Sequence, residues 1–510
     1  MAENARPPGP PAAFNLAHHV FHFRARPPDK IALNIATSNR CIQTRYDDLE
    51  RMVLGVAAGL KSHGLRPGAH VLLRLGNTIH FPIAYLGAIA GGFIPVVTSS
   101  ALTQGECTSV AKLTSPVAIV AGPGIALPET QDALLIHQGD LENWFEMPGA
   151  DYAMGMPDRP AYVVMTSGTQ GAPRAVLHAH RAIWARQMMW DDWEGLTSED
   201  RLMHAGAFNW TYTLGTGLLD PWTIGATAIV PDAQARPLDL PEIARAQGAT
   251  IFAAAPGIFR KLLRADADFG PGLRHALSAG EKMPEGTRAL WRKKTGTDIH
   301  EAFGMSECST FISGAPRRPA TGTALGWPQS GRKIALLSDG GTPVAEGDVG
   351  QIAIHAGDPG LMLKYLGAAR VTRDRFTAGY FLTGDLARMD DAGAIHYMGR
   401  ADDMLNAGGF RVSPVEVEQA MGMLGTIVDC AAIEVPVAVD TTIIALYYTG
   451  EKADEAVLQA HAERHLARYK QPRRYVHMPD LPRGPNNKVS RRRLRAEAAH
   501  DEVGHGQSET

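Results

Sequence analysis

A run of small and hydroxyl-bearing residues separates two apolar segments near residue 170. The apolar run from Tyr162 ends at Met165, and a stretch rich in Gly, Ser and Thr continues to Arg174. Glycines let successive backbone N–H groups face one concavity, and hydroxyls and a guanidinium add donors. This chemistry suits a polyphosphate, although an ordinary turn has a similar composition. No Gly-Lys-Ser/Thr follows, so this is not a Walker A motif. The predicted phosphate ligands are Thr166, Ser167, Gly168, Thr169, Gln170, Gly171 and Arg174.

Three charged residues in a second dense stretch, residues 379–418, could hold the rest of a nucleotide. Asp385 follows Thr-Gly, and a carboxylate on a tight turn can accept hydrogen bonds from two ribose hydroxyls. Arg400 and Arg411 could bind phosphate or ribose. The competing interpretations are a turn aspartate and surface salt bridges.

The segments around these residues predict a layered α/β protein. Strand-like and helix-like patterns alternate along the chain, which favours sheets covered by helices. Residues 14–27 and 47–62 are predicted helices. The apolar stretch Phe81–Val97 contains Gly87, Gly91, Gly92 and Pro95, which favours a buried helix followed by a buried strand over a membrane span.

Composition sets limits on function. The chain has 510 residues, which predicts more than one domain, and its net charge of −3 gives no overall attraction to nucleic acid. The 4 cysteines are widely spaced without metal-ligand or disulfide patterns, and no signal peptide is evident, so we expect a cytoplasmic protein.

The stretch from Thr166 to Arg174 resembles the phosphate loop of the adenylate-forming superfamily, which includes acyl-CoA synthetases. The family pattern is Thr-Ser-Gly-Thr-Thr-Gly-x-Pro-Lys-Gly; here Gln170, Arg174 and Ala175 replace Thr, Lys and Gly. Four further motifs follow in family order, and the resemblance covers roughly residues 14–498. It implies a large N-terminal domain of layered α/β sheets (1–398), a hinge (399–402) and a small mobile α+β C-terminal domain (403–510).

The resemblance assigns roles to residues of two central motifs. Phe303 would flank adenine, Ser306 would contact phosphate, and Glu307 would hold Mg²⁺ as a hard oxygen ligand. Leu277–Pro284 resembles an adenine-side signature. The implied ATP-binding residues of these motifs are Gly280, Glu281, Lys282, Ala302, Phe303, Gly304, Met305 and Ser306.

In the C-terminal part, Asp402 matches the hinge of the family, and Gly408 and Gly409 would let the pantetheine arm of CoA pass close to the backbone. Residues 482–491 resemble Pro-Arg-Thr-x-x-Gly-Lys-Ile-x-Arg, which places Lys488 on the catalytic lysine; the other implied catalytic residues are Thr166 and Glu307. Asn487 replaces Gly, but Asn also tolerates a left-handed backbone. The ten Lys and Arg residues between 466 and 495 more simply form a solvated face that partly meets CoA than a nucleic-acid site.

The acid itself is predicted from few residues. Residues 209–228 read as core helix packing or as the wall of an acyl pocket, and both readings can hold for different residues. We assign Phe208, Trp210 and Gly304 to the pocket. Acetate-using relatives carry Trp where this chain has Gly304, which predicts a larger acid: medium-chain, branched or aryl.

Together these features predict an ATP- and Mg²⁺-dependent acid–CoA ligase that forms AMP and pyrophosphate through an acyl-adenylate. Its partners would be a carboxylic acid, ATP and CoA, with no nucleic acid and no membrane span, and a homodimer is left open. One alternative is a stand-alone adenylation enzyme that passes the acyl group to a carrier protein. A non-enzymatic alternative is a nucleotide- or RNA-binding protein.

Overall fold

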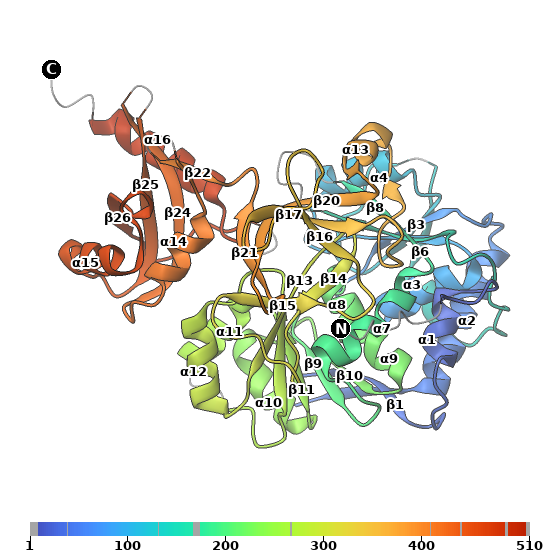
Figure 1. Ribbon diagram of the computed structural model, residues 1–510. Helices are drawn as coiled ribbons and strands as arrows, with labels where there is room; N and C mark the ends of the chain where they lie inside the picture. Colours follow the sequence, from blue (N-terminus) through green and yellow to red (C-terminus); the bar gives the residue numbers. More distant parts are fainter. Residues whose placement is uncertain are drawn as a thin grey trace.

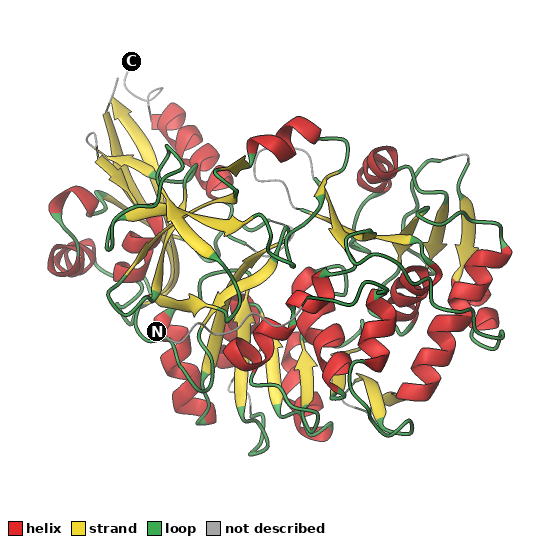
Figure 2. Cartoon of the chain, turned by 45° about the vertical axis from the view of Figure 1, so that its right-hand side comes forward, coloured by secondary structure: helices red, strands yellow, loops and turns green. Residues whose placement is uncertain are grey.

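A computed structural model describes residues 9–37, 39–130, 132–166, 174–265, 268–407, 410–438, 441–484 and 488–505. Residues up to about 400 form the larger part of the molecule. The C-terminal part, orange to red in Figure 1, stands beside it and follows directly after β21. Two large sheets and their covering helices make up the larger part (Figure 2).

The first sheet has seven strands in the order β18-β8-β7-β4-β3-β5-β6. Its centre is parallel, whereas β8 runs antiparallel to β7 and β18 antiparallel to β8. Because β7 and β8 form a hairpin, the Gly-rich loop joins two antiparallel strands. The strands are β3 (His70–Arg74), β4 (Ile94–Val97), β5 (Ala118–Ala121), β6 (Leu134–His137), β7 (Pro160–Met165), β8 (Ala175–Ala179) and β18 (Lys364–Tyr365).

The second sheet has 14 strands, parallel from β1 through β10, β9, β11 and β12 to β13, and antiparallel from β13 to β16. Its strands are β1 (Ile31–Ala36), β2 (Cys41–Arg45), β9 (Arg201–His204), β10 (Thr227–Pro231), β11 (Ile251–Ala254), β12 (His275–Ala279), β13 (Ile299–Met305), β14 (Ser309–Ser313), β15 (Ala324–Pro328), β16 (Ile334–Leu337), β17 (Val349–His355), β19 (Phe376–Thr377), β20 (Tyr380–Met389) and β21 (Ile395–Arg400).

Helices of this larger part cover the sheets because their apolar faces need burial. They are α1 (Leu16–His22), α2 (Tyr46–Ser62), α3 (His80–Gly91), α4 (Gln104–Thr114), α5 (Gln138–Trp144), α6 (Ala182–Ala185), α7 (Gln187–Met189), α8 (Thr211–Leu214), α9 (Asp220–Ile224), α10 (Leu240–Ala246), α11 (Pro256–Arg264), α12 (Glu285–Thr295) and α13 (Ala369–Asp374). π-Helical turns occupy Trp190–Glu194 and Gly215–Leu219, and a 3-10 turn occupies Pro237–Asp239. The buried helix α3 and the strand β4 confirm the prediction for residues 81–97.

The smaller C-terminal part is α+β. The three-stranded sheet β24-β25-β26 and the hairpin β22-β23 pack with three helices. The elements are β22 (Leu405–Ala407), β23 (Phe410–Val412), α14 (Pro414–Met421), β24 (Ile427–Ala438), β25 (Thr441–Gly450), α15 (Glu455–His465), a 3-10 turn (Arg468–Lys470), β26 (Arg474–His477) and α16 (Arg491–His505).

One predicted helix is shorter than expected. The helix predicted over residues 14–27 is α1, Leu16–His22. The guanidinium of Arg26 explains the early end, since it donates hydrogen bonds to the carbonyls of Val20 and Phe21 in the last turn. The predicted fold class is otherwise confirmed: a large N-terminal α/β part of layered sheets and a small C-terminal α+β part.

Candidate functional site

The Gly-rich loop is closed at its base by backbone hydrogen bonds. The Thr166 N–H donates to the Arg174 carbonyl at 2.9 Å, and the Arg174 N–H donates to the Thr166 hydroxyl at 3.2 Å. Ser167, Gly168, Thr169, Gln170 and Gly171 lie outside the described residues. Both ends of the predicted phosphate loop are therefore fixed by the hairpin of β7 and β8.

Arg174, Tyr365 and Glu307 come together beside this base. The Arg174 guanidinium lies 5.4 Å from the centre of the Tyr365 ring, and the Tyr365 hydroxyl donates to Glu307 Oε1 at 2.6 Å. The Met362 N–H also donates to the Glu307 carbonyl at 2.7 Å. The sequence analysis missed Tyr365, which neighbours Lys364 in β18 and belongs to none of the five motifs.

The chemistry of this group fits Mg²⁺. Among the described residues, no group of three or more His, Cys, Asp or Glu side chains could hold a metal ion. Mg²⁺ is commonly bound through one or two carboxylates together with substrate phosphates. Glu307, buried and oriented by Tyr365, supplies such a carboxylate.

The predicted adenine and ribose residues are linked through Tyr397. Its ring centre lies 5.4 Å from that of Phe303, and its hydroxyl donates to Asp385 Oδ1 at 2.9 Å. Asp385 also lies opposite Arg400 in the pairing of β20 with β21. Burial raises the pKa of the Asp385 carboxyl, whereas Arg400, Tyr397 and Lys488 act to lower it. Tyr397, three residues before Arg400, was also missed.

Arg400 connects the predicted ribose carboxylate with the predicted hinge. Its Nη1 lies 3.2 Å from Asp385 Oδ2, and its Nε donates to Asp402 Oδ1 at 3.2 Å. Arg411 belongs to β23, where its backbone faces Asn406. The position of the Arg411 side chain, and Gly408 and Gly409, lie outside the described residues.

The strand β13 presents the central motif. Ala302 is buried, and Phe303, Gly304, Met305 and Ser306 continue toward the turn before β14. The Ser306 carbonyl lies 2.8 Å from the ring Nε2 of His178, which fixes the turn against β8.

Residues 280–282 divide between two environments. Gly280 has φ +97°, and a Cβ there would lie 2.6 Å from the Trp210 ring, so the indole lies directly on this glycine. Burial raises the pKa of Glu281, and Arg260, Arg483 and Lys488 oppose that shift. The Lys282 amine pairs with the Glu301 carboxylate at 2.8 Å, and its role in ATP binding stays a prediction.

Lys488 lies on a loop of the C-terminal part that is closed by its own backbone. The Gly484 N–H donates to the Lys488 carbonyl at 2.8 Å, and Ser490 N–H donates to the Pro482 carbonyl at 2.7 Å. The positive charge of Lys488 opposes the upward pKa shift that burial causes at Glu281 and at Asp385. Ion pairs also join this loop to Glu281, since Arg483 and Arg260 both contact Asp429 and Arg260 lies 4.0 Å from Glu281.

The residues predicted for the acyl pocket lie in different surroundings. Phe208 is buried in the main core and stacks on Phe81 with ring centres 5.5 Å apart. A Cβ on Gly304 would lie 2.3 Å from the Ser309 carbonyl oxygen, so the hairpin of β13 and β14 requires glycine there. The absence of a side chain at Gly304 thus has a packing cause, which weakens the inference of an open pocket floor.

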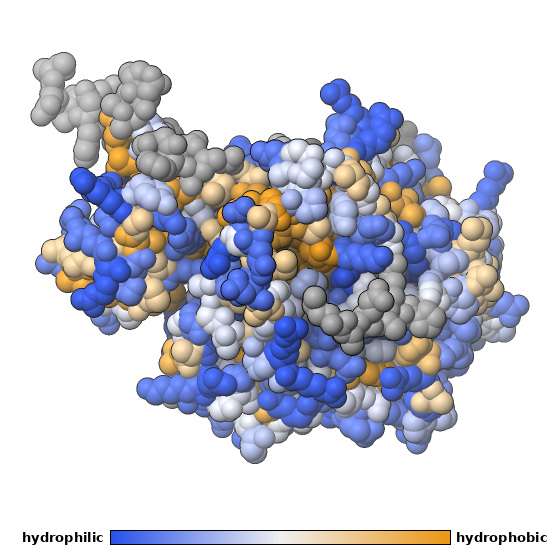
Figure 3. All heavy atoms as spheres, in the orientation of Figure 1, coloured by the Kyte–Doolittle hydropathy of each residue, from blue (hydrophilic) through white to orange (hydrophobic). Residues whose placement is uncertain are grey.

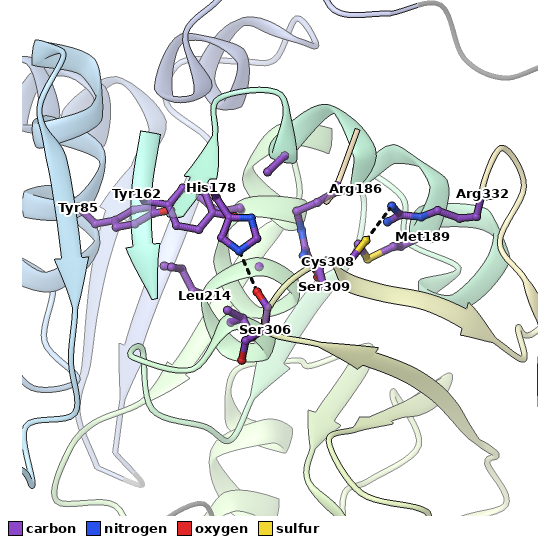
Figure 4. A pocket seen from close by; sticks show the side chains of 15 residues that line it. Tyr85, Tyr162, His178, Arg186, Met189, Leu214, Ser306, Cys308, Ser309 and Arg332 are labelled. Carbon is purple, nitrogen blue, oxygen red and sulfur yellow. Dashed lines mark hydrogen bonds between the residues drawn. The ribbon is translucent and has the colours of Figure 1, made fainter. Parts of the chain in front are cut away.

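A cavity opens along the same segment but uses other residues. Figure 4 shows the rings of Tyr85, Tyr162 and His178 on one side and Arg186 and Cys308 on the other. Within the described part of the chain, the Tyr85 hydroxyl and His178 Nδ1 have no hydrogen-bond partner. The other lining residues are Ala182, Met189, Thr211, Leu214, Gly215, Leu219, Ser306, Ser309, Arg332 and Gly360.

The charges at this cavity are balanced. Arg186 pairs with Asp220 in the protein interior and donates to Ser309 Oγ at 2.6 Å. Arg332, which also lines the cavity, pairs with Asp358. Burial lowers the pKa of His178 to about 4, so its ring is neutral near pH 7. The cavity therefore combines two paired arginines with neutral donors and acceptors between aromatic and aliphatic walls.

The surface adds two observations. On the face seen in Figure 3, hydrophilic residues cover most of the outer surface, and a group of hydrophobic residues gathers near the centre. In the described ranges, no helix is both long and apolar enough to cross a bilayer.

Two family models and several relatives match this chain. The family model "AMP-binding enzyme" matches residues 20–366, and "AMP-binding enzyme C-terminal domain" matches residues 416–488. Benzoate–CoA ligase of Thauera aromatica is 28% identical over 483 residues, covering 88% of this chain and 90% of that protein. The 4-hydroxybenzoate–CoA/benzoate–CoA ligase of Rhodopseudomonas palustris is 28% identical over 482 residues, covering 88% of each.

Solved structures share the whole fold. An anthranilate CoA ligase in complex with anthranoyl-AMP superposes with a TM-score of 0.87 at 24% identity, covering 96% of this chain and 98% of that one. A benzoate CoA ligase from Burkholderia xenovorans LB400 gives a TM-score of 0.84 at 25% identity, covering 94% of this chain and 100% of the other.

The fold and the matched domains define an adenylate-forming enzyme, which confirms the predicted superfamily. The chain belongs to the AMP-binding enzyme family. It is an AMP-forming acid–CoA ligase, as the sequence motifs indicated.

Proposed function

We propose that the protein activates an aryl acid and transfers its acyl group to CoA. The acid belongs to the predicted class larger than acetate, and the aryl subclass is supported by the benzoate and hydroxybenzoate ligases among its relatives. The walls of the cavity, formed in part by Tyr85, Tyr162 and His178, suit an aromatic ring with a neutral polar substituent.

In the first half-reaction, a carboxylate oxygen of the acid attacks the α-phosphorus of ATP. The bond to the bridging oxygen breaks, pyrophosphate leaves, and an acyl-adenylate forms. Such transfers depend on positioning and on neutralising charge. Thr166, the loop 167–171 and Arg174 bind the phosphates. Glu307 would hold Mg²⁺, which would supply further positive charge when bound. Asp385 and Arg400 bind ribose, Phe303 flanks adenine, and Lys488 faces the reacting oxygens.

The second half-reaction uses another pose of the C-terminal domain. Residues 403–510 turn relative to residues 1–398 about the hinge 399–402, which withdraws Lys488. The CoA thiol loses its proton, sulfur attacks the acyl carbon, and the bond to AMP breaks. Gly408 and Gly409 flank the pantetheine arm. Alternating poses isolate each step from water in turn.

The observation that carries this proposal is that ion pairs join the loop of Lys488 to Glu281 in the larger part of the molecule. A lysine of the C-terminal part that faces the predicted nucleotide residues is what adenylation requires. A carrier-protein acceptor remains the alternative for the second step. A homodimer remains a prediction, and the 4 free cysteines support the proposed cytoplasmic location.

A CoA-dependent AMP-release screen tests the proposal. The acids are benzoate, the hydroxybenzoates, anthranilate, octanoate and acetate, each assayed with and without CoA. We expect the aryl acids to give the highest kcat/KM and acetate the lowest. Adenylate formation without any acyl-CoA product would favour the carrier-protein alternative, and nucleotide binding without pyrophosphate release would favour the non-enzymatic one.

A further inference from the structure

An ion-pair chain crosses between the two parts of the molecule. Arg260 in α11, from the larger part, lies with Nη2 3.5 Å from Asp429 Oδ2 in β24 of the smaller part. The same Asp429 oxygen accepts a short bond from Arg483. One carboxylate is thus shared by two guanidiniums, one from each part of the chain.

Both ends of this series of ion pairs lie beside residues of the candidate site. Arg260 Nη2 also lies 4.0 Å from Glu281 Oε2, next to the positive-φ Gly280. Arg483 belongs to the loop that carries Lys488: residues 483 and 489 form a β-bridge, and Gly484 N–H binds the Lys488 carbonyl at 2.8 Å. Fixing Arg483 therefore fixes the backbone of Lys488.

The three side chains of these ion pairs are largely shielded from solvent. The exposed fractions of the side chains are 10% for Arg260, 14% for Asp429 and 17% for Arg483. Exposed ion pairs are weak because water screens them, whereas partly buried charges that lose a partner are left poorly solvated. Turning the C-terminal part away must separate Arg260 from Asp429, while Arg483 keeps its partner within the same part.

We propose that Arg260 and Asp429 are positioning residues for adenylation: their contact holds the C-terminal domain in the pose that presents Lys488. The role rests on the proposed function of Lys488. It acts through that lysine and not through contact with the reacting atoms, and it applies to the first half-reaction alone. In the thioester-forming pose the contact is broken.

The test compares Arg260→Ala with Arg260→Lys and with Lys261→Ala, a matched exposed cation one residue along α11. Adenylation is measured as pyrophosphate release with the best acid of the screen. Thioester formation is measured from the corresponding chemically made acyl-adenylate and CoA. We expect Arg260→Ala to slow adenylation about tenfold and thioester formation less than about twofold. Arg260→Lys should recover most of the loss, and Lys261→Ala should match the parent.

Asp429→Asn provides the coupling test. Because either variant breaks the contact between Arg260 and Asp429, the two losses should not add, and the double variant should be slowed by less than the product of the two single effects. Equal slowing of both half-reactions by Arg260→Ala, or additive losses in the double variant, would overturn the proposal.

A readout without catalysis separates this proposal from the proposed function. Trypsin can cut after Arg400 in the hinge once the domain opens, and cleavage of a transiently open form follows its population. Arg260→Ala should increase cleavage after Arg400 about tenfold, and Lys261→Ala should not. If the parent protein is inactive on every acid but the variants show this cleavage pattern, the proposed function is refuted and the contact between the two parts is supported. If the parent is active on the acids but Arg260→Ala leaves the cleavage unchanged, the proposed function stands and the positioning role of the contact is refuted.

Discussion

The hydroxyl of Tyr365 donates a 2.6 Å hydrogen bond to the carboxylate of Glu307, which joins the edge strand β18 of the first sheet to the turn between β13 and β14 of the second. The ring of the same tyrosine lies under the Arg174 guanidinium at 5.4 Å. One side chain therefore orients both the predicted metal ligand and the cation at the end of the phosphate loop.

Removing that hydroxyl should weaken the metal site. Tyr365→Phe keeps the ring under Arg174 but leaves Glu307 free to rotate, so we expect about tenfold lower kcat/KM at limiting Mg²⁺ and partial recovery at high Mg²⁺. A Mg²⁺ titration of adenylation measures this. Tyr397→Phe is the matched control, since it removes a hydroxyl from Asp385 and should leave the Mg²⁺ dependence unchanged.

Lys488→Ala should separate the two half-reactions. Loss of one charge that stabilises the transition state typically costs about 100- to 1000-fold in rate. We expect that loss in pyrophosphate release, whereas acyl-CoA formation from a supplied acyl-adenylate continues at nearly the parent rate. Equal losses in both assays would reject the assigned role.

Asp385→Asn should impair nucleotide binding. The amide keeps the shape but loses the charge that pairs with Arg400 at 3.2 Å, and it offers ribose a weaker acceptor. We expect the KM for ATP to rise about tenfold or more with a smaller effect on the KM for the acid. An unchanged ATP titration would argue against ribose binding at this position.

The ion pair of Arg332 with Asp358 offers a stability prediction. Both side chains are 0% exposed, and Arg332 also donates to the Thr310 carbonyl at 3.0 Å. Removing one partner leaves a buried charge, so Asp358→Ala should lower the free energy of unfolding by about 3–5 kcal/mol. Asp374→Ala, which breaks the exposed pair with Arg370, should leave urea unfolding unchanged.

His180 predicts how stability depends on pH. Burial lowers its pKa to about 3, and its Nδ1 accepts a 2.9 Å hydrogen bond from the Leu16 N–H, which protonation would abolish. The unfolded chain takes up the proton near pH 6.5, so stability falls as pH drops from about 6.5 toward 3. Chemical denaturation at several pH values should show a shallower acid slope for His180→Asn than for the parent. An identical slope would show that other groups dominate this range.

The sequence predicted the fold where local patterns and burial agree. Helix α2 and the pair α3–β4 followed from apolar spacing and glycine placement, because their cores are built from neighbouring residues. Helix α1 was predicted too long because its end depends on Arg26, whose guanidinium also binds the carbonyl of Trp222, 196 residues away. No local pattern reports such a contact.

At the candidate site, too, residues within local motifs could be predicted, whereas residues that depend on distant contacts could not. Glu307, Asp385 and Arg400 could be predicted because motifs keep candidate groups in short runs, and their roles at the site stay predictions. Tyr365 and Asp429 were not found, since their significance comes from partners brought close by folding. Lys282 was predicted from its sequence position, and its pairing with Glu301 of β13 could be seen only in the structure. The cavity proposed for the acid lies along the predicted segment but is lined by other residues, among them Thr211, Leu214 and Gly215. One reason is the π-helical turn Gly215–Leu219, whose side chains do not follow the α-helical period.

The indole of Trp210 rests on the bare Cα of Gly280, so a predicted acyl-pocket residue directly touches a predicted adenine-side residue. Replacing this tryptophan would also remove the support beneath the segment that leads to Glu281. Directed-evolution libraries that aim at a new acid should therefore vary positions 210 and 280 together.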